Sequence, residues 1–410
     1  MRILMVSEDL PSAGMGGLAR HVLSLSRALV AAGHPVDLMG NDDVPISEAG
    51  TDFEFDGRFF PELRGQFDGW KEMTLGVFMP PKRSVIARRF AKAVLRRAPH
   101  YDAIHYHGHL PNIARYIPAT VNFIQTRHDQ GSDCLIHTRF KRGRICRSSD
   151  ARNCAECRTW QPNALQRTVT TIAVTRFRSE VAEGFRRHKT VFVSDLLRQN
   201  LARSLGPGPW GVTVHNFVDR ELLKTARSAS PANGVDINNE TLRVFIAAKL
   251  YPAKGVEAFL ETLAHKMEHE LQVEIVGDGS DEQRLRERFP FAHFHGWQDW
   301  QSSLKIAARA HAIVVPSVCE EACPSTVLEG LLLGKTVFAL QLGGTPELAA
   351  YECGPSQLRL HATMAELVDA LLAFRPRPDY PLAPRTPTGA AEAAGQLLAL
   401  YRLPPGPIAA

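Results

Sequence analysis

Apolar residues in the first half of the chain alternate between short continuous runs and helical spacing. The run at 2–7 predicts a buried strand, and apolar residues spaced over 18–32 predict a helix that ends at Gly33. A second amphipathic helix is predicted at 83–97. The β-loop-α-β opening is typical of a nucleotide-binding α/β domain. Further strands are predicted at 36–39, 103–106, 121–126, 170–174, 190–193 and 212–214, whereas 42–81 lacks clear periodicity.

The same alternation resumes after a polar stretch at 228–239. It predicts a second doubly wound sheet. We therefore expect an N-terminal domain of residues 1–218, a C-terminal domain of residues 219–385, and a final segment, 386–410, whose helix packs back on the first domain. The predicted strands are 242–247, 271–276, 292–295, 312–315 and 336–340, and the predicted helices are 256–265, 281–288, 304–310, 364–374 and 390–401.

Composition and charge narrow the class of protein. The 410 residues are 44% apolar and 22% charged, no apolar run is long enough to cross a membrane, and the N-terminus turns acidic too early for a signal peptide. We expect a cytoplasmic protein. The net charge is +10 over residues 1–220 and −5 over residues 221–410, which favours an anionic partner for the first half. Helix 83–97 is basic beside its apolar stripe, so it either contacts anionic lipid at the inner membrane face or exposes its basic side to solvent as a crossover helix.

Polar clusters follow two of the predicted strands. His105, His107 and His109 lie at the end of one strand, and Arg127-His128-Asp129 follows the next. Ligands of open α/β sheets bind beyond the carboxyl ends of the strands. These side chains are therefore candidates for a site, although each histidine also fits a structural position at a strand end.

Four cysteines follow His128 among basic residues. Cys134, Cys146, Cys154 and Cys157 have the spacing C-x11-C-x7-C-x2-C. Four thiols with one C-x2-C pair suit a tetrahedral structural zinc site in a cytoplasmic protein. Free thiols or labile disulfides are the alternative, because the spacing is irregular.

The stretch 319–348 combines acidic residues with a predicted helix start. Glu321 precedes Pro324-Ser325-Thr326, where a proline in the first turn and a Ser or Thr cap predict the start of a helix, and Glu329 lies about one turn into it. Carboxylates beside a helix N-terminus can hold sugar hydroxyls and a phosphate. Taken alone, the pattern fits a capped surface helix equally well.

A glycine-rich loop follows the first strand. Gly14, Gly16 and Gly17 fit the G-x-G-x-x-[GA] dinucleotide pattern with Ala19. The loop between the strand and this motif is longer than in dehydrogenases, so a nicotinamide site is disfavoured. We expect instead a turn that lets a ligand approach the backbone.

The motifs together resemble those of retaining glycosyltransferases of family 4, which have the GT-B fold. The resemblance spans nearly the whole chain, and its most specific element is the E-x7-E pair. It implies an α/β protein with two Rossmann-like, doubly wound domains facing across a cleft. The matching motifs are the loop Gly14–Gly17, Thr126-Arg127-His128-Asp129, Val193-Ser194, Asn216 with Asp219, Lys249-x4-Lys254-Gly255, Gly277-Asp278-Gly279, and Glu321 with Glu329.

The resemblance also implies roles for individual residues. Lys249 and Lys254 would bind the donor diphosphate, assisted by the backbone N–H groups near Ser325 and Thr326. The remaining donor contacts would come from Glu321 to the sugar, Glu329 to the ribose, Gly16, Gly17 and Gly277 along the backbone, and Gly296 and Trp297 at the base. His128 would lie near the reacting carbon, so His128, Glu321 and Lys254 are the expected catalytic residues.

The sequence departs from the family pattern at three places. Lys249 stands where arginine is usual, which keeps the charge and loses the bidentate fork. Phe217 stands where glycine is usual. The run Cys319–Cys323 replaces a glycine-containing run, and Glu320 competes with Glu321 for its role, although the spacing to Glu329 selects Glu321.

The expected activity is transfer of a hexose-type sugar from a nucleoside-diphosphate sugar to a hydroxyl acceptor, with retention. We expect no catalytic metal, since no DxD motif occurs. The basic first half suits a lipid-linked or anionic acceptor, as in surface polysaccharide or glycoconjugate assembly, and no nucleic acid. The alternatives are a sugar-nucleotide epimerase of the same fold and a non-catalytic nucleotide-sugar-binding protein.

Overall fold

The computed structural model describes most of the chain and divides it into two units. Unit 1 comprises residues 1–142, 146–216 and 390–410, and unit 2 comprises residues 143–145 and 217–389. These divisions lie close to the expected boundaries at 218 and 385. The description omits residues 12–15, 44, 49–52, 54, 65–72, 76, 79–80, 158, 219–227, 229–240, 268–270, 376–377, 382 and 409–410, so Gly14, Asp219 and much of the stretch 42–81 lie outside it.

Unit 1 is built on a seven-stranded parallel sheet with the order β11-β10-β7-β6-β1-β2-β3. The order runs outward from β1 in both directions, which is the doubly wound arrangement expected from the alternating pattern. Its strands are β1 (Ile3–Val6), β2 (Val36–Asn41), β3 (Phe59–Leu63), β6 (Ala103–His107), β7 (Phe123–Arg127), β10 (Lys189–Phe192) and β11 (Val212–Thr213).

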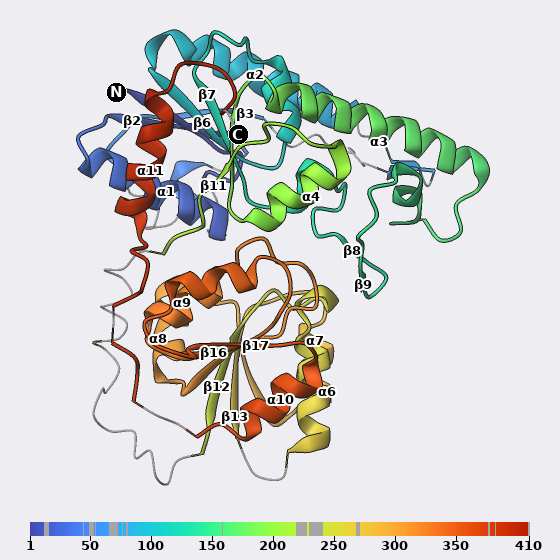
Figure 1. The fold of residues 1–410 in the computed structure, drawn as a ribbon, viewed down its shortest axis with the longest axis vertical. Helices are drawn as coiled ribbons and strands as arrows, with labels where there is room; N and C mark the ends of the chain where they lie inside the picture. The colour runs from blue at the N-terminus through green and yellow to red at the C-terminus, as the bar shows by residue number, and fades with distance from the viewer. Residues whose placement is uncertain are drawn as a thin grey trace. The chain divides into compact units, whose positions relative to one another are not determined.

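Helices and short turns complete unit 1 (Figure 1). The helices are α1 (Gly17–Ala31), α2 (Pro81–Arg97), α3 (Ala164–Phe185), α4 (Asp195–Leu205) and α11 (Ala390–Arg402). Two small hairpins pair β4 (Met73–Thr74) with β5 (Val77–Phe78) and β8 (Phe140–Lys141) with β9 (Arg144–Ile145). Of these four strands, β9 is grouped with unit 2. The 3-10 turns are η1 (Ile46–Glu48), η3 (Ala98–His100), η4 (Pro111–Tyr116), η5 (Gln130–Ser132) and η6 (Ala151–Cys157).

Helix α2 packs its apolar stripe into the core of unit 1. Phe90 and Val94 are buried in a cluster with residues of β1, β6 and β7. Part of the basic side is also engaged within the chain, since Arg83 donates to the carbonyl of Leu135 and Arg97 pairs with Glu62. The helix is therefore a crossover helix, and its apolar stripe is not available to insert into a lipid surface.

The strand predicted at 170–174 is wrong, because these residues lie inside helix α3. The β-branched run resembles a strand, but a capping box between Asn163 and Gln166 starts a helix just before it. The hydroxyl of Thr171 donates to the carbonyl of Arg167, four residues earlier, over 2.7 Å. A helix brings these two groups together, whereas an extended strand separates them.

The C-terminal helix α11 belongs to unit 1 and lies beside α1 (Figure 1). The buried hydroxyl of Tyr401 is 2.6 Å from Nδ1 of His105 on β6. The amide of Asn122 donates to the carbonyl of Tyr401 over 2.8 Å, and Nζ of Lys189 donates to the carbonyl of Leu403 over 2.9 Å. The final segment is thus bonded directly to the strands of the first sheet.

Unit 2 is built on a six-stranded parallel sheet with the order β14-β13-β12-β15-β16-β17. The strands are β12 (Arg243–Ala247), β13 (Gln272–Val276), β14 (Ala292–Gly296), β15 (Ala312–Val315), β16 (Thr336–Leu340) and β17 (Leu358–His361). The helices are α6 (Val256–Lys266), α7 (Glu282–Arg288), α8 (Trp300–Arg309), α9 (Ser325–Leu332) and α10 (Met364–Leu372), with 3-10 turns η7 (Pro252–Lys254) and η8 (Thr345–Tyr351).

The core of unit 2 lies between this sheet and α6, α7 and α10. Phe259 of α6, Phe338 of β16 and Leu367 of α10 are fully buried in one cluster. Helices α8 and α9 lie on the opposite side of the sheet (Figure 1). Both units are therefore three-layered α/β folds with parallel sheets. Across the described residues, no helix carries enough consecutive apolar sequence to traverse a bilayer.

Candidate active site

Unit 2 has a pocket at the carboxyl ends of β12 and β15. These two strands are neighbours at the point where the strand order reverses, which is where open α/β sheets bind ligands. The pocket encloses about 190 Å³. It is lined by Ala247, Ala248, Lys254, Val315, Pro316, Ser317, Glu321, Cys323, Pro324, Ser325 and Thr326.

An ion pair stands inside this pocket. Nζ of Lys254 contacts Oε1 of Glu321, and the hydroxyl of Ser317 donates to the same oxygen over 2.7 Å. Burial alone would lower the pKa of Lys254, but the neighbouring Glu321 carboxylate outweighs it and raises the pKa above its ordinary value. Lys254 therefore stays charged at neutral pH, with its side chain 21% exposed to the pocket.

Close backbone packing places Lys254. Gly255 adopts a left-handed conformation with φ of +67°, and a Cβ there would overlap the carbonyl oxygen of Pro316. The N–H of Val318 donates to the carbonyl of Ala253 over 3.1 Å. The turn that carries Lys254 is thus fastened to the loop that follows β15.

A second glycine turn places Glu321. Gly343 has φ of +65°, and a Cβ there would lie 2.5 Å from the carbonyl oxygen of Glu321. The N–H of Gly344 donates to this same carbonyl over 2.8 Å. The loop after β16 therefore supports the acidic loop from behind and fixes the direction of Glu321, while Glu320 does not line the pocket.

Helix α9 begins at the pocket. The helix start expected at Pro324-Ser325-Thr326 is confirmed, but the expected Ser or Thr cap is wrong: the N-cap is Pro324, and no side chain caps the helix. Proline has no side-chain acceptor, so the first backbone N–H groups receive no cap bond from it. Ser325 and Thr326 both line the pocket. The N-terminus of α9 thus offers polar N–H groups and a positive dipole end beside Lys254.

Glu329 lies in the second turn of α9 and does not line the pocket. The indole N–H of Trp300, at the start of α8, donates to its Oε1 over 2.9 Å. No sequence pattern indicated Trp300, because the pairing joins two helices that are separate along the chain. The bond fixes the orientation of the Glu329 carboxylate.

Lys249 stands apart from the pocket. Its Nζ donates to Oδ1 of Asp278 over 2.7 Å, and its side chain is 61% exposed. The loop after β12, which carries Lys249, and the loop after β13, which carries Asp278, are joined by backbone hydrogen bonds. One of these runs from the N–H of Leu250 to the carbonyl of Asp278. Gly277 in turn bonds to the carbonyl of Gly296 over 2.9 Å, and Trp297 beside it is 54% exposed. These residues form a continuous edge beyond β12, β13 and β14.

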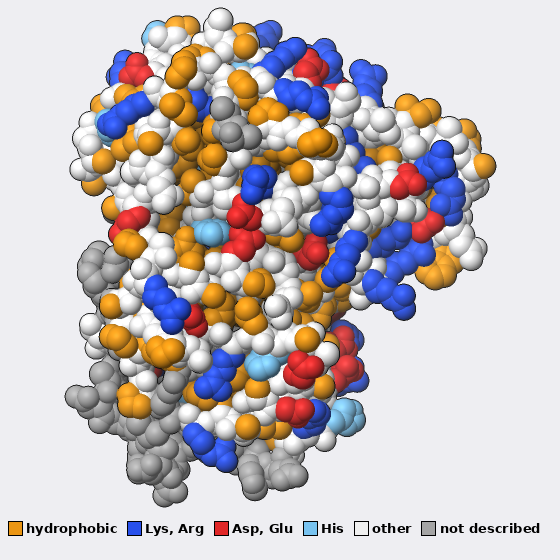
Figure 2. Space-filling view, in the orientation of Figure 1, with side chains coloured by type: hydrophobic (Ala, Val, Ile, Leu, Met, Phe, Trp, Pro, Cys, Tyr) orange, Lys and Arg blue, Asp and Glu red, His pale blue; other side chains and the backbone are white. Residues whose placement is uncertain are grey.

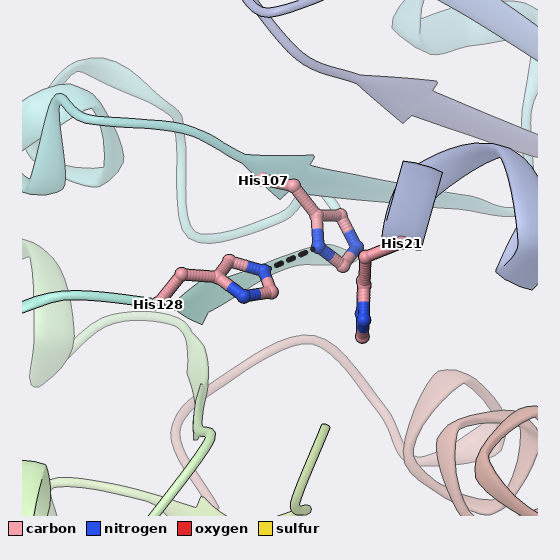
Figure 3. A group of neighbouring side chains, drawn as sticks. All are labelled: His21, His107 and His128. Atoms are coloured by element: carbon pink, nitrogen blue, oxygen red, sulfur yellow. Dashed lines mark hydrogen bonds between the residues drawn. The ribbon is translucent and has the colours of Figure 1, made fainter. Parts of the chain in front are cut away.

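Three histidines meet at the carboxyl edge of the unit 1 sheet (Figure 3). His107 ends β6, His128 follows β7, and His21 comes from the first turns of α1. Nδ1 of His107 is 3.0 Å from Nε2 of His128, and the ring of His21 lies 4.8 Å from that of His128. The sequence placed His107 and His128 at the ends of two strands as site candidates, but it did not predict that they meet, and it missed His21, whose helix position gave no signal.

Burial keeps these rings uncharged. It lowers the pKa of His21 to about 3 and lowers the pKa of His107 and of His128 well below the ordinary value, with the neighbouring histidines adding to the effect for the last two. Between His107 and His128, one ring must therefore donate and the other accept. The cluster offers neutral hydrogen-bonding groups instead of charge.

The loop after β7 is held by buried polar contacts. The guanidinium of Arg127 is fully buried and donates to the carbonyl of Gly108 over 2.8 Å. Asp129 accepts from Nδ1 of His109 and from Nδ1 of His137, each over 3.0 Å. Burial alone would raise the pKa of Asp129, but these partners hold it well below the ordinary value. His128 is thus flanked by two anchored residues.

Gly16 and Gly17 lie at the start of α1, where Gly16 is the N-cap without a side-chain cap bond. A Cβ at either position would meet no described atom within 4 Å. Packing among the described residues therefore does not demand glycine here.

Two family models match the chain. The model described as Glycosyltransferase Family 4 matches residues 15–222, and the model described as Glycosyl transferases group 1 matches residues 241–374. The chain belongs to glycosyltransferase family 4. No curated protein matches it significantly.

Solved glycosyltransferase structures share the fold at low sequence identity. Sucrose-phosphate synthase from Thermosynechococcus elongatus is 17% identical, with a TM-score of 0.57 over 98% of this chain and 95% of the other. HepE from Anabaena, in complex with UDP and glucose, is 15% identical, with a TM-score of 0.59 over 98% and 97%. The catalytic domain of starch synthase IV from Arabidopsis thaliana, bound to ADP and acarbose, is 15% identical, with a TM-score of 0.59 over 98% of both chains. The chain therefore has the GT-B fold.

The residues expected from this glycosyltransferase family divide into those that line the unit 2 pocket, those that lie outside its lining, and those that belong to unit 1. Lys254, Glu321, Ser325 and Thr326 line one pocket, together with Ser317, which the sequence did not suggest because a single serine after a strand is common. Glu329 and Lys249 lie outside the pocket lining, each with a polar partner. His128, Gly16 and Gly17 belong to unit 1 and are described apart from that pocket.

Proposed function

We propose that this glycosyltransferase transfers a sugar from a nucleoside-diphosphate sugar to a hydroxyl group, with retention of the anomeric configuration and without a catalytic metal. The observation that carries the proposal is the unit 2 pocket, where Lys254 and the uncapped N-terminus of α9 border one space of about 190 Å³. A cation and a helix N-terminus together form an anion-binding site.

The pocket suits a diphosphate leaving group in particular. As the bond between the anomeric carbon and the phosphate oxygen breaks, negative charge grows on the diphosphate. Lys254, which is charged at neutral pH, and the N–H groups at Ser325 and Thr326 stabilise that charge. This stabilisation is stronger in the transition state than in the ground state, so it accelerates the reaction.

Glu321 has a separate role in the proposal. It is paired with Lys254 and Ser317 in the structure. When the donor phosphate takes Lys254 as its counterion, Glu321 keeps the bond from Ser317 and accepts hydrogen bonds from sugar hydroxyls. Glu329, oriented by Trp300, accepts from the ribose hydroxyls, and Lys249 adds a second positive charge near the diphosphate.

The reaction itself needs no side-chain nucleophile. The acceptor oxygen forms a bond to the anomeric carbon on the face that the leaving phosphate vacates, and its proton passes to an oxygen of that phosphate. For His128 we propose a neutral hydrogen bond to the donor sugar, since its lowered pKa removes it as a proton donor at neutral pH.

Two observations bear on donor and acceptor class. The related structures that hold UDP with glucose, and ADP with acarbose, support a nucleoside-diphosphate sugar as donor. Arg142, Arg144 and Arg147 are exposed on and beside the β8–β9 hairpin, where Figure 2 shows basic side chains gathered. Exposed arginines support an acceptor that bears phosphate or is linked to a lipid carrier, as in surface polysaccharide or glycoconjugate assembly.

A donor screen followed by product analysis tests the proposal. Thermal shifts with UDP-, GDP- and ADP-sugars identify the donor, and incubation with donor and an acceptor panel should give a glycoside of unchanged anomeric configuration by NMR. Lys254→Ala and Glu329→Ala should lose transfer. Lys266→Ala is the control and should keep transfer, because Lys266 lies at the C-terminal end of α6 and pairs there with Asp369 of α10. An epimerised donor formed without acceptor, donor binding without any turnover, or full activity in Lys254→Ala contradicts the proposal.

A further inference from the structure

Four cysteines of unit 1 surround one small cavity that the proposed transfer reaction does not use. Cys134 follows η5, Cys146 follows β9, and Cys154 and Cys157 lie in η6. All four line the same enclosed space of about 20 Å³. The fold therefore gathers thiols that are spread over the segment 134–157 into one place.

The four thiols share this space with one another and with the side chain of Arg178, which also lines it. All four are free thiols, so no disulfide accounts for the convergence. Thiolates are the preferred protein ligands of soft or borderline divalent cations such as Zn²⁺.

A buried guanidinium beside the cluster points to a negative centre. Arg178 of α3 is 7% exposed and donates to the carbonyls of Asp133 and Ser149, and its Nη2 lies 4.0 Å from Sγ of Cys154. Among the described residues it has no carboxylate partner within ion-pair distance. A buried charge without a counterion is costly. The carboxylate of Asp133, whose carbonyl accepts from Arg178, is paired with Arg139.

We propose that Cys134, Cys146, Cys154 and Cys157 bind one structural Zn²⁺ ion as thiolates. The four thiols release their protons to solvent on binding, and the resulting tetrathiolate centre carries a net charge of −2, which supplies the counter-charge that Arg178 lacks. An N–H···S bond from Arg178 to Cys154 is the kind of outer contact that orients metal ligands.

Binding requires the sulfur atoms to move together. The described groups whose ligand atoms already lie within 4.8 Å of one another all contain histidines, and the four cysteines are not among them. A tetrahedral zinc site has Zn–S bonds of about 2.3 Å, so the ion draws the thiolates inward and fills the small cavity. The result fastens η6 and the basic β8–β9 hairpin to helix α3.

Metal analysis of the full-length protein tests the site. Protein purified without chelators should contain about one zinc per chain, and a thiol-modifying mercurial should release it stoichiometrically. Replacing zinc with Co²⁺ should give sulfur-to-cobalt charge-transfer absorption together with the intense d–d bands of a tetrahedral thiolate site. Cys154→Ser/Cys157→Ser should lower the zinc content at least about fivefold.

Two further variants separate loss of the ligands from loss of the fold. Cys157→His replaces one zinc ligand with another, so this variant should still bind zinc and should give an altered cobalt spectrum. A misfolded protein would do neither. Cys353→Ser changes a buried cysteine of unit 2 and should keep the full zinc content. Wild-type protein without zinc that also gives no cobalt spectrum, or a disulfide between any two of the four cysteines, overturns the proposal.

Discussion

The carboxyl edges of the two sheets carry opposite kinds of polar chemistry. In unit 2, Lys254 and Glu321 are a charged pair whose side chains remain 21% and 18% exposed. In unit 1, His105 and His107 are fully buried, and burial lowers the pKa of each well below the ordinary value. The unit 2 edge keeps a charged pair in contact with solvent, whereas the unit 1 edge buries neutral histidines beside the ion pair of His109 with Asp129.

The difference follows from what surrounds each edge. The unit 2 loops are joined backbone to backbone, as at Gly255 with Pro316 and Gly343 with Glu321, so side chains are left to point into the pocket. The unit 1 edge is filled by the side chains themselves, with His105 bonded to Tyr401 and Thr126. The same strand topology can therefore present a site for an anion or a site for uncharged hydroxyls.

The largest expected effect comes from removing the cation of the unit 2 edge. Lys254→Ala should lower kcat/KM by roughly 100-fold or more, because it removes a charge that stabilises the departing diphosphate. Steady-state kinetics with the identified donor measure the loss. Lys266→Ala also removes one lysine from an ion pair with an aspartate, and it should change kcat/KM less than about twofold. Equal losses in both variants would contradict the assignment.

A smaller loss is expected when the support behind Glu321 is disturbed. Gly343→Ala should lower kcat/KM by roughly 10-fold or more, because a Cβ at φ of +65° meets the backbone of Glu321 and shifts its carboxylate. Gly395→Ala is the matched control, since a Cβ there meets no described atom within 4 Å and Ala favours helix α11. Wild-type kinetics in Gly343→Ala would show that Glu321 needs no support from this turn.

The neutral edge of unit 1 gives a distinct prediction. NMR of the imidazole nitrogens should show His107 and His128 uncharged at pH 6.5, where an ordinary histidine is about half protonated, because burial lowers the pKa of both. His128→Asn keeps a hydrogen-bonding side chain and should lower kcat by roughly 10-fold, without shifting the pH profile. A titration of either ring near pH 6.5 would remove the contrast between the two edges.

The smallest effect concerns stability. Burial alone would lower the pKa of His109, but hydrogen bonds to Asp129 and Asp9 raise it to about 11. A raised histidine pKa stabilises the fold fully below about pH 6.5, and the stabilisation disappears as the pH rises through 11. His109→Gln should therefore lose about 1 kcal/mol near pH 6 and progressively less at higher pH. Denaturant unfolding at several pH values checks this, and a loss that grows with pH contradicts it.

Much of the fold was predictable because hydrophobic periodicity is local. The parallel strands of both units and the crossover helix α2 follow from runs and spacings that a short window of sequence contains. The failures have physical causes. The run 170–174 is β-branched and yet helical, because the cap at Asn163 and the buried face of α3 outweigh its local preference. The strands β3 and β17 were not predicted, since Pro61 interrupts β3 and the polar residues Arg359 and His361 leave β17 without an apolar run.

The candidate site was predictable where its residues follow predicted strands of one sheet. Lys254, Glu321 and the start of α9 could be placed at one edge because each follows a strand of the same sheet. Partners that come from elsewhere in the chain could not be predicted, and Trp300 at Glu329 and His21 beside His128 are the examples. Such pairings depend on how helices pack on the sheet, which no spacing in the sequence encodes.

Calorimetric titration of the free nucleoside diphosphate into wild type, Lys254→Ala and His128→Asn tests the central claim most directly. The ligand carries the diphosphate and no sugar, so it probes the anion site alone. The account predicts that Lys254→Ala weakens binding roughly 10- to 100-fold, whereas His128→Asn binds like wild type. Wild-type affinity in Lys254→Ala, or an equal loss in His128→Asn, would contradict the assignment of the unit 2 pocket as the diphosphate site.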